Sequence, residues 1–446
     1  MLIKKILKES PYFMLGVLII FFLCTHKPNV GYDTPSYIYF SESRPLFYPL
    51  FILLFRWGGI YQFTLIMWVQ GILLFIALLY ARYWLRKNLK IFDFSIFLVF
   101  LWVLITISFH YQIAFIQSEG LSFPLFVFVF FLLIECFQKF NLKKISYLSF
   151  LVSILILVRL QFYYFYIIFG LLCLWYLWQH VPFKALILGA AILFGSAGVT
   201  ILIDHGYHYF KHGFFSSAPY AGILTLVQGI YLADSNAAHY FKDPIEKAYV
   251  QQMINQRDAQ HLNRDASLII TLKPLYFEYA YQSYRRNFLA IQEMIENILQ
   301  AKNETFHSKL ESNVLAIDIG KTLIFYESER NILFFLWKFI ECMGGIPGFL
   351  FFFILLLSWF FKMTKNKIME PDFSSLFVAI ATIITFLNAA IIALCNPDLP
   401  PYFCYSQFIL YCLAAFLASQ IFSKNSPSEL PKKSSVLERE IKYDVV

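Results

Sequence analysis

Apolar stretches long enough to cross a lipid bilayer recur along most of this 446-residue chain. Runs such as FPLFVFVFFLL (123–133) and FLFFFILLLSWFF (349–361) contain no charged residue. A helix needs about 20 apolar residues to cross a hydrocarbon core of roughly 30 Å. Because only 14% of all residues are charged, the chain has too little charge to cover the surface of a soluble protein of this size. The sequence therefore predicts an all-α polytopic membrane protein.

The apolar runs predict about ten transmembrane helices. Their approximate ranges are 11–26, 60–80, 91–110, 119–138, 145–158, 161–178, 185–203, 345–361, 373–394 and 403–422. A single helix over 145–178 would be about 51 Å long, too long for one crossing. An arginine near its middle would also be costly in lipid. Two short helices that meet at Arg159 are therefore expected.

Lysine and arginine residues gather in alternate connections between these helices. They are Lys4, Lys5, Lys8, Arg82, Arg86, Lys87, Lys90, Lys139, Lys143, Lys144, Lys184, Lys362, Lys365 and Lys367. Short basic loops face the cytoplasm, which predicts that both termini are cytoplasmic. No small-residue cleavage site follows the first apolar run, so the first helix is predicted not to be cleaved. The loops 111–118 and 395–402 contain no lysine or arginine, as expected outside. The net charge of +8 then follows from topology, and no nucleic-acid partner is predicted.

This topology predicts four parts. Residues 1–203 form an N-terminal transmembrane module with a catalytic first outside loop at 27–59, and residues 204–330 form a mostly helical outside domain. Residues 331–422 form the C-terminal transmembrane helices, and 423–446 form a cytoplasmic tail. High usage of Phe, Ile, Lys and Asn, typical of AT-rich genomes, favours a bacterial inner membrane, with the outside domain in the periplasm.

Two helices are predicted inside the outside domain. In DPIEKAYVQQMINQ, Asp243 is a candidate N-cap and Pro244 occupies the first helical position, where proline is favoured. In NFLAIQEMIENILQ, Ile291, Ile295 and Ile298 share one helix face.

Two acids, Asp33 and Glu119, and two arginines, Arg44 and Arg159, are predicted at the outer face of the membrane. The stretch GYDTPSYIYFSESRPLFYPL (31–50) contains Asp33, Glu42 and Arg44, and RPLFYPLFILLF predicts a helix in the membrane interface. FIQSEGLSFP places Glu119 at the start of a span, and LVRLQFYY places Arg159 between two spans. A carboxylate can act as a general base on a hydroxyl or amine, and an arginine can hold a phosphate by two hydrogen bonds. Together these groups suit transfer of a group from a lipid phosphate.

Each of these residues also has an ordinary structural interpretation. Asp33 in YDTP is a common turn residue. Glu119 favours a helix N-terminus, and Arg159 could extend its charged end to the interface. The residues alone do not decide between these interpretations and a shared site.

The order of these features resembles the GT-C superfamily of integral membrane glycosyltransferases. GYDTPSYIYF followed by RPLFYPLFILLF is similar to bacterial members related to protein O-mannosyltransferases and lipid A aminoarabinose transferases. By that resemblance Asp33 matches the catalytic base and Glu119 a second acid, while Arg44 and Arg159 would contact the carrier phosphate or the sugar. The resemblance covers mainly the first 180 residues or so.

The resemblance implies an inverting transfer from a polyprenyl-phosphate sugar to a glycan, lipid or protein acceptor on the periplasmic face. Glu42, Tyr402 and Lys338 are further candidate substrate-binding residues. The chain departs from the pattern of the GT-C superfamily just before the last span, where family members often have Arg-Tyr. This chain has Pro401-Tyr402, which leaves the sugar open.

Two other clusters have less specific patterns. Asp204, His208 and His212 are spaced four residues apart. They could bind zinc or form the end of an interfacial helix, so the sequence does not decide whether the protein binds a divalent metal. Lys338 and Glu341 are three apart and could line a cavity or pair with each other.

Two other functions remain alternatives to a transferase. A flippase for a lipid-linked saccharide should have paired repeats and polar groups near the membrane midplane. No such repeat is found in the sequence, and most of the charges are predicted at the outer interface. An O-antigen polymerase or ligase would also have about ten spans and a large outside loop, but would be expected to rely more on loop arginines than on a first-loop Asp.

Overall fold

The computed structural model describes residues 2–31, 33–263, 266, 274–300, 308–366, 372–397 and 400–425. Throughout these residues the regular structure is helical, apart from one parallel β-bridge between Asn29 and Phe115. The prediction of an all-α polytopic membrane protein is confirmed at this level. Most of the predicted tail lies outside the described residues.

The helices follow one another in this order: α1 (Leu2–Thr25), α2 (Thr34–Ile38), α3 (Phe47–Leu54), η1 (Arg56–Tyr61), α4 (Gln62–Asn88), α5 (Asp93–Val103), η2 (Leu104–Ser108), α6 (Phe109–Tyr111), α7 (Glu119–Gln138), α8 (Leu142–Val158), η3 (Leu160–Tyr164), α9 (Phe165–Trp178), α10 (Phe183–His212), α11 (Ala221–Leu232), η4 (Ala237–Tyr240), α12 (Pro244–Ala259), α13 (Pro274–Gln300), α14 (Ser308–Tyr326), α15 (Ser328–Cys342), α16 (Gly345–Asn366), α17 (Phe373–Cys395) and α18 (Pro400–Asn425).

Within the described residues, seven helical segments are long and apolar enough to cross a membrane. They are Arg56–Asn88, Glu119–Gln138, Leu160–Trp178, Phe183–His212, Gly345–Thr364, Phe373–Cys395 and Tyr402–Phe422. Each coincides with one of the ten predicted spans. The predicted spans at 11–26 and 91–110 correspond to the shorter apolar helices Pro11–Thr25 and Asp93–Ser108, and 145–158 lies in the 17-residue α8. The length and composition of the helices therefore support seven membrane crossings, and the total of ten crossings remains a prediction.

The predicted break at Arg159 is confirmed. Helix α8 ends at Val158, and Arg159 has an extended backbone with φ −156° and ψ 115°. A 3-10 turn over Leu160–Tyr164 then leads into α9. The break places the arginine side chain at the end of the helix instead of in its middle.

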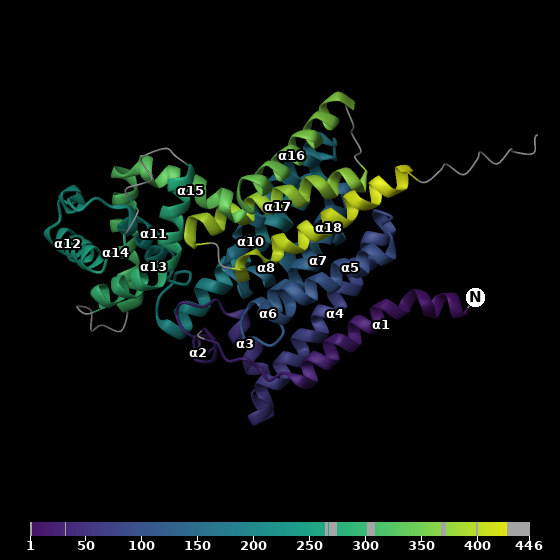
Figure 1. The fold of residues 1–446 in the computed structure, drawn as a ribbon, viewed down its shortest axis with the longest axis horizontal. Coiled ribbons are helices and arrows are strands. Elements are labelled where there is room, and N and C mark those ends of the chain that lie inside the picture. Colours follow the sequence, from purple (N-terminus) through teal and green to yellow (C-terminus); the bar gives the residue numbers. More distant parts are fainter. Residues whose placement is uncertain are drawn as a thin grey trace, which may run out of the picture.

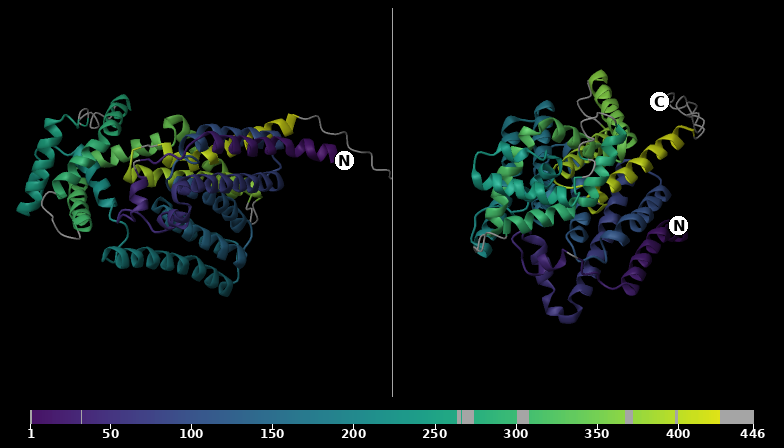
Figure 2. Two further views of the ribbon diagram at one scale, coloured as in Figure 1. Left: turned by 90° about the horizontal axis from the view of Figure 1, so that it is seen from below. Right: turned by 60° about the vertical axis from the view of Figure 1, so that its left-hand side comes forward.

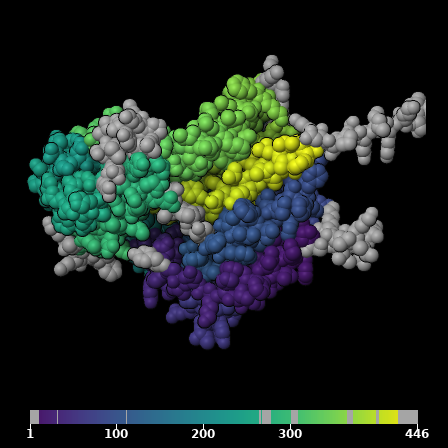
Figure 3. All heavy atoms as spheres, viewed as in Figure 1, coloured from purple at the N-terminus to yellow at the C-terminus, as the bar shows by residue number. Residues whose placement is uncertain are grey.

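The molecule consists of a helical bundle and a lobe beside it (Figure 1). The lobe comprises α11 to α15, and its own apolar core includes Ile223, Tyr231, Ile295 and Phe334. The space-filling view shows this lobe, in teal and green, next to the apolar bundle (Figure 3).

Both helices predicted inside the lobe are present. The Asp243 side chain accepts a hydrogen bond from the amide of Ile245 at 2.6 Å and so caps α12. Ile291, Ile295 and Ile298 are buried on α13. Capping and apolar periodicity were sufficient here because both act within one helix.

Several connections predicted to be cytoplasmic lie together at one end of the bundle. Lys90 and Asp372, from two of these connections, and Gln138, the last residue of α7, line one cavity of about 460 Å³. The start of α1 and the end of α18 lie at the end away from the lobe (Figures 1 and 2). This grouping agrees with the alternation of basic and uncharged loops.

The topology can be tested by cysteine labelling of intact cells. The exposed native Cys24 is first replaced by Ser, and a cysteine is placed at the exposed Gln260 in the lobe or at the exposed Lys87. A membrane-impermeant maleimide is expected to label position 260 and to label position 87 only after the membrane is opened, because basic loops stay in the cytoplasm. Labelling of position 87 in intact cells would contradict the predicted topology.

Candidate active site

The first loop, which follows α1, is tied to the loop that precedes α7. The Asn29 amide donates to the Ala114 carbonyl at 2.7 Å, and the Ile116 amide donates to the Asn29 carbonyl at 3.1 Å. The Thr34 hydroxyl donates to the Ile116 carbonyl at 3.0 Å. Segments that are far apart in the sequence therefore position Asp33 and Glu119 in one region.

Gly120 allows α4 to pack closely against the loop that precedes α7. The Gln70 side-chain amide of α4 donates to the carbonyls of Gln112 and Phe115 at 3.0 and 3.1 Å. A Cβ atom on Gly120 would lie 2.0 Å from the Gln70 amide nitrogen. The glycine after Glu119 is thus required by the close approach of Gln70.

Asp33 and Arg44 form an ion pair inside the first loop. Asp33 precedes α2, whose first turn contains Pro35. The Arg44 guanidinium also donates from Nε to the Ser36 hydroxyl at 2.7 Å and from Nη1 to the Tyr37 hydroxyl at 3.2 Å. The Asp33 side chain is still 46% exposed. The loop therefore orients this carboxylate while leaving it accessible.

Glu119 and Arg159 form a second ion pair, and this one is buried. Their side chains are only 8% and 11% exposed. Arg159 also donates from Nε to Gln161 at 2.9 Å, and its guanidinium carbon lies 4.5 Å from the centroid of the Tyr402 ring. The resemblance implied that Arg159 contacts the carrier phosphate or the sugar. Instead it is packed among protein groups.

Tyr37 and Ser118 connect the two ion pairs. The Tyr37 hydroxyl accepts from Arg44 and donates to the Ser118 hydroxyl at 3.2 Å. Ser118 in turn donates to Glu119 Oε2 at 3.3 Å. Sequence reasoning missed this link, although Tyr37 lies four residues after Asp33 in the same polar stretch and Ser118 directly precedes Glu119.

Amide side chains extend the network toward α17 and α18. Gln161 Nε2 donates to Asn388 Oδ1 at 2.6 Å and to the Tyr402 carbonyl at 3.2 Å. Asn388 donates to the Ser406 hydroxyl at 3.0 Å. Tyr402, a predicted substrate-binding residue, therefore belongs to the support beneath Arg159.

Electrostatics hold both arginines in their charged form. Burial acts to lower the pKa of Arg44, but the Tyr37 phenol and the Asp33 carboxylate outweigh it, so the pKa is raised above its ordinary value. Burial likewise acts to lower the pKa of Arg159, and the adjacent Glu119 outweighs it, so this pKa is raised well above its ordinary value. Burial raises the pKa of Tyr37, which keeps its phenol protonated as the bridging donor.

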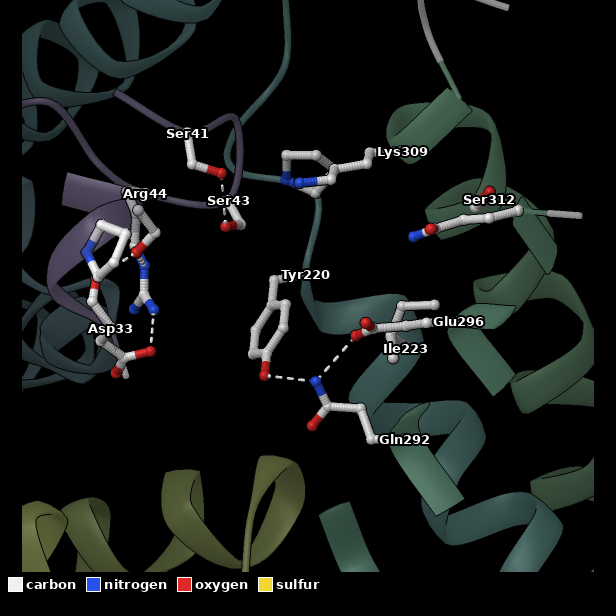
Figure 4. A pocket seen from close by; sticks show the side chains of 14 residues that line it. Asp33, Ser41, Ser43, Arg44, Tyr220, Ile223, Gln292, Glu296, Lys309 and Ser312 are labelled. Atoms are coloured by element: carbon white, nitrogen blue, oxygen red, sulfur yellow. Dashed lines mark hydrogen bonds and ion pairs between the residues drawn. The ribbon is translucent and has the colours of Figure 1, made fainter. Parts of the chain in front are cut away.

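A polar cavity of about 330 Å³ separates the first loop from the lobe (Figure 4). The first loop contributes Asp33, Ser36, Ser41, Ser43 and Arg44, and the lobe and its approach contribute Tyr220, Gln292, Glu296, Lys309 and Ser312. Gln292 Nε2 donates to the Tyr220 hydroxyl at 3.1 Å and to Glu296 at 2.8 Å. Arg44 and Asp33 lie across the cavity from these residues (Figure 4). Sequence patterns gave no signal for the lobe's wall, because only docking of the lobe creates it.

The other predicted site residues lie elsewhere or at the margin. Glu42 is half-buried between Ser41 and Ser43. Lys338 is fully buried in the lobe, where its Nζ donates to Gln228 at 3.0 Å and lies 5.1 Å from the centroid of the Tyr284 ring. Lys338 was predicted to bind substrate, but it is packed in the lobe and does not line the cavity at Asp33.

Asp204 and His208 are buried on α10, with 3.8 Å between Asp204 Oδ1 and His208 Nε2. Over the part of the chain that the structure describes, no group of three or more His, Cys, Asp or Glu side chains could hold a metal ion. The interpretation of Asp204, His208 and His212 as a zinc site therefore gains no support.

Replacement of Lys338 by Met is expected to change how stability depends on pH. Burial lowers the pKa of Lys338 to about 8 from 10.5, so the folded protein releases this proton more readily than the unfolded chain. Unfolding then takes up a proton between about pH 8 and 10.5, and the free energy of unfolding of the wild type should rise by about 3 kcal/mol across this window.

The measurement is thermal or denaturant unfolding of the purified protein at a series of pH values. Lys338→Met should lose this rise and be more stable than the wild type near pH 7. The same substitution at the exposed Lys247 should keep the wild-type slope. Parallel slopes for Lys338→Met and wild type would show that Lys338 stays charged when buried.

Searches with the sequence and with the fold find no matching protein-family model, curated protein or solved structure.

Proposed function

We propose that this protein is an inverting membrane glycosyltransferase, which transfers a sugar from a polyprenyl-phosphate carrier to an acceptor hydroxyl at the outer face of the membrane. The observation that carries the proposal is the Asp33 carboxylate. It is held by Arg44, partly exposed, and lies on a polar cavity beside a bundle of apolar helices.

The reaction needs a base and a group that accepts negative charge. Asp33 removes the proton from the acceptor hydroxyl as its oxygen bonds to the anomeric carbon of the sugar. The bond between that carbon and the carrier phosphate breaks, and the phosphate leaves with the electron pair. A single displacement inverts the anomeric configuration. Arg44, which adjoins Asp33, stabilises the phosphate as its charge grows.

The buried pair of Glu119 and Arg159 has a positioning role in this proposal. Through Ser118 and Tyr37 it supports the arginine that orients Asp33. Groups that are locked by packing and hydrogen bonds hold a catalytic side chain in a productive geometry. The resemblance to GT-C enzymes led us to expect both acids at one site, and this hydrogen-bonded connection supports that expectation.

The lobe supplies the acceptor side in this proposal. Tyr220, Gln292 and Glu296 offer hydroxyl, amide and carboxylate groups toward the cavity. Such groups suit an acceptor that carries several hydroxyls, and an acceptor entering here would meet Asp33 on the opposite wall.

The test uses purified protein in lipid nanodiscs with a panel of polyprenyl-phosphate and polyprenyl-diphosphate sugars. Release of polyprenyl monophosphate that depends on added acceptor, with an inverted anomeric centre by NMR, is the expected result. Turnover restricted to diphosphate donors would favour a polymerase or ligase. Movement of labelled carrier across liposomes without any cleavage would favour a flippase.

A further inference from the structure

The cavity that Lys90, Gln138 and Asp372 line, here named the inner cavity, lies where α18 ends, at the end of the bundle away from the lobe (Figure 1). Its walls come from the end of α4, the connection to α5, the end of α7, the start of α17 and the last turns of α18. The connections that contribute to it are predicted to be cytoplasmic. The inner cavity therefore lies at the predicted inner surface of the membrane, whereas Asp33 lies at the outer surface.

Two polar side chains in the walls of the inner cavity have unpaired atoms. Ser419 is 5% exposed, and its hydroxyl has no hydrogen-bond partner among the residues that the structure describes. Within the same residues, the side-chain oxygen of Gln138 is also shielded from solvent and unpaired. Because buried polar groups are nearly always hydrogen-bonded, a hydroxyl and a carbonyl left over in one cavity indicate a ligand that both accepts and donates hydrogen bonds.

The walls of the inner cavity also carry one charge of each sign. Lys90 is exposed and contributes an ammonium group. Asp372 accepts a hydrogen bond from the Ser375 amide at 3.1 Å and lies 3.8 Å from the Lys362 ammonium, yet its side chain is still 61% exposed. A ligand with one negative and one positive group would meet an opposite charge at each wall, whereas a simple anion would also meet the Asp372 carboxylate.

Apolar surface adjoins these polar walls. Phe92 and Phe373 line the inner cavity beside the charged residues. Helix α5 begins next to Phe92, and its residues Phe94, Leu98 and Trp102 are exposed at four-residue spacing, which places them on one helix face. An apolar face therefore runs from the region of the cavity along the bundle, as the acyl chains of a bound lipid would require.

We propose that the inner cavity binds the headgroup of phosphatidylethanolamine, a zwitterionic phospholipid, from the inner leaflet of the membrane. Lys90 and the Ser419 hydroxyl hold the phosphate, and Asp372 and the Gln138 carbonyl accept hydrogen bonds from the primary ammonium. The quaternary ammonium of a choline lipid has no N–H group for these two acceptors. The proposal does not rest on the proposed transferase function.

The helices that meet at the inner cavity carry the candidate active site at their other ends. Helix α7 begins at Glu119 and ends at Gln138. Gln70 lies on α4, Asn388 on α17 and Tyr402 on α18. A headgroup bound at the inner cavity would join these four helices, and a ligand that binds only the folded protein stabilises it. Phosphatidylethanolamine is therefore expected to raise the unfolding temperature.

The test is native mass spectrometry of the full-length protein in detergent over a series of lipid concentrations. Dioleoyl phosphatidylethanolamine is compared with the glycerol and choline lipids of the same chains, and with free phosphoethanolamine. Wild-type protein is expected to bind the ethanolamine lipid about tenfold more tightly than either other lipid, since each of those lacks the N–H groups that face Asp372 and Gln138. Free phosphoethanolamine should compete poorly, because it has no acyl chains.

Two substitutions separate the charges of the inner cavity. Asp372→Asn keeps the cap on α17, since asparagine also accepts from the Ser375 amide, and should abolish the preference for phosphatidylethanolamine over phosphatidylglycerol. Lys90→Gln should weaken binding of both lipids by about tenfold. Lys184→Gln makes the same change at an exposed lysine at the start of α10, outside the inner cavity, and should bind as the wild type does.

Equal binding of phosphatidylethanolamine and phosphatidylglycerol by the wild type would overturn the proposal. Equal losses in Lys90→Gln and Lys184→Gln would overturn it as well, because they would show adsorption to a basic surface instead of binding in the cavity. Competition by free phosphoethanolamine at the affinity of the lipid would assign a soluble ligand and exclude the lipid. None of these measurements uses sugar transfer, so this proposal and the transferase function fail separately.

Discussion

Asp33→Asn is expected to reduce the rate of sugar transfer by about 10²–10⁴-fold, the usual effect of losing a general base. Asparagine keeps the size of the side chain and can still accept a hydrogen bond from Arg44, but it cannot take a proton from the acceptor. Because Asp33 lies in a loop and is 46% exposed, the variant should fold and insert normally. Transfer is measured with purified protein in nanodiscs at saturating donor.

Asp318→Asn provides the control, since this exposed acid of α14 lies outside the cavity and should leave the rate unchanged. Donor binding by Asp33→Asn should also be close to that of the wild type, which separates loss of the base from loss of the site. Near-normal transfer by a folded Asp33→Asn would make Glu119 the candidate base. If Glu119→Gln were active as well, the transferase proposal would lose its main support.

The sequence allowed the prediction of residues whose neighbours along the chain define their setting. Asp33 and Arg44 follow one apolar run, and Arg159 interrupts another, so periodicity and the cost of charge in lipid predicted that they lie beyond the ends of apolar helices, as the structure has them. The pairing could not be predicted. Nothing in the sequence indicates that Asp33 pairs with Arg44 and Glu119 with Arg159, since either acid could meet either arginine.

The residues that connect and support these pairs were also missed. Ser118, Gln161 and Asn388 carry short polar side chains that occur throughout proteins, and their role arises from contacts between helices distant in sequence. Lys338 shows the reverse case. Its charge in an apolar context suggested a contact with substrate. In the structure its ammonium group instead donates a hydrogen bond to Gln228 on α11, inside the lobe.

Arg159→Met is expected to lower the free energy of unfolding by about 3–5 kcal/mol, because it leaves the Glu119 carboxylate buried without its charged partner. Glu119 is 8% exposed, so water cannot replace the guanidinium. Arg159→Lys should recover only part of the loss, since one ammonium group cannot contact Glu119, Ser118 and Gln161 with the geometry of the guanidinium. Unfolding is followed in detergent by tryptophan fluorescence during heating or titration with denaturant.

Lys362→Met is the matched control, because Lys362 pairs with Asp372 at 3.8 Å where the two side chains are 49% and 61% exposed. That change should cost about 1 kcal/mol or less. The double variant Glu119→Gln with Arg159→Met should be less destabilised than the sum of the single variants, since neither charge is then left unpaired. The resemblance to GT-C enzymes implied a direct contact between Arg159 and the carrier phosphate or the sugar. A folded Arg159→Met with wild-type stability and a raised donor KM would restore that role, whereas the structure leads us to expect loss of stability first, with loss of activity following from the displaced first loop.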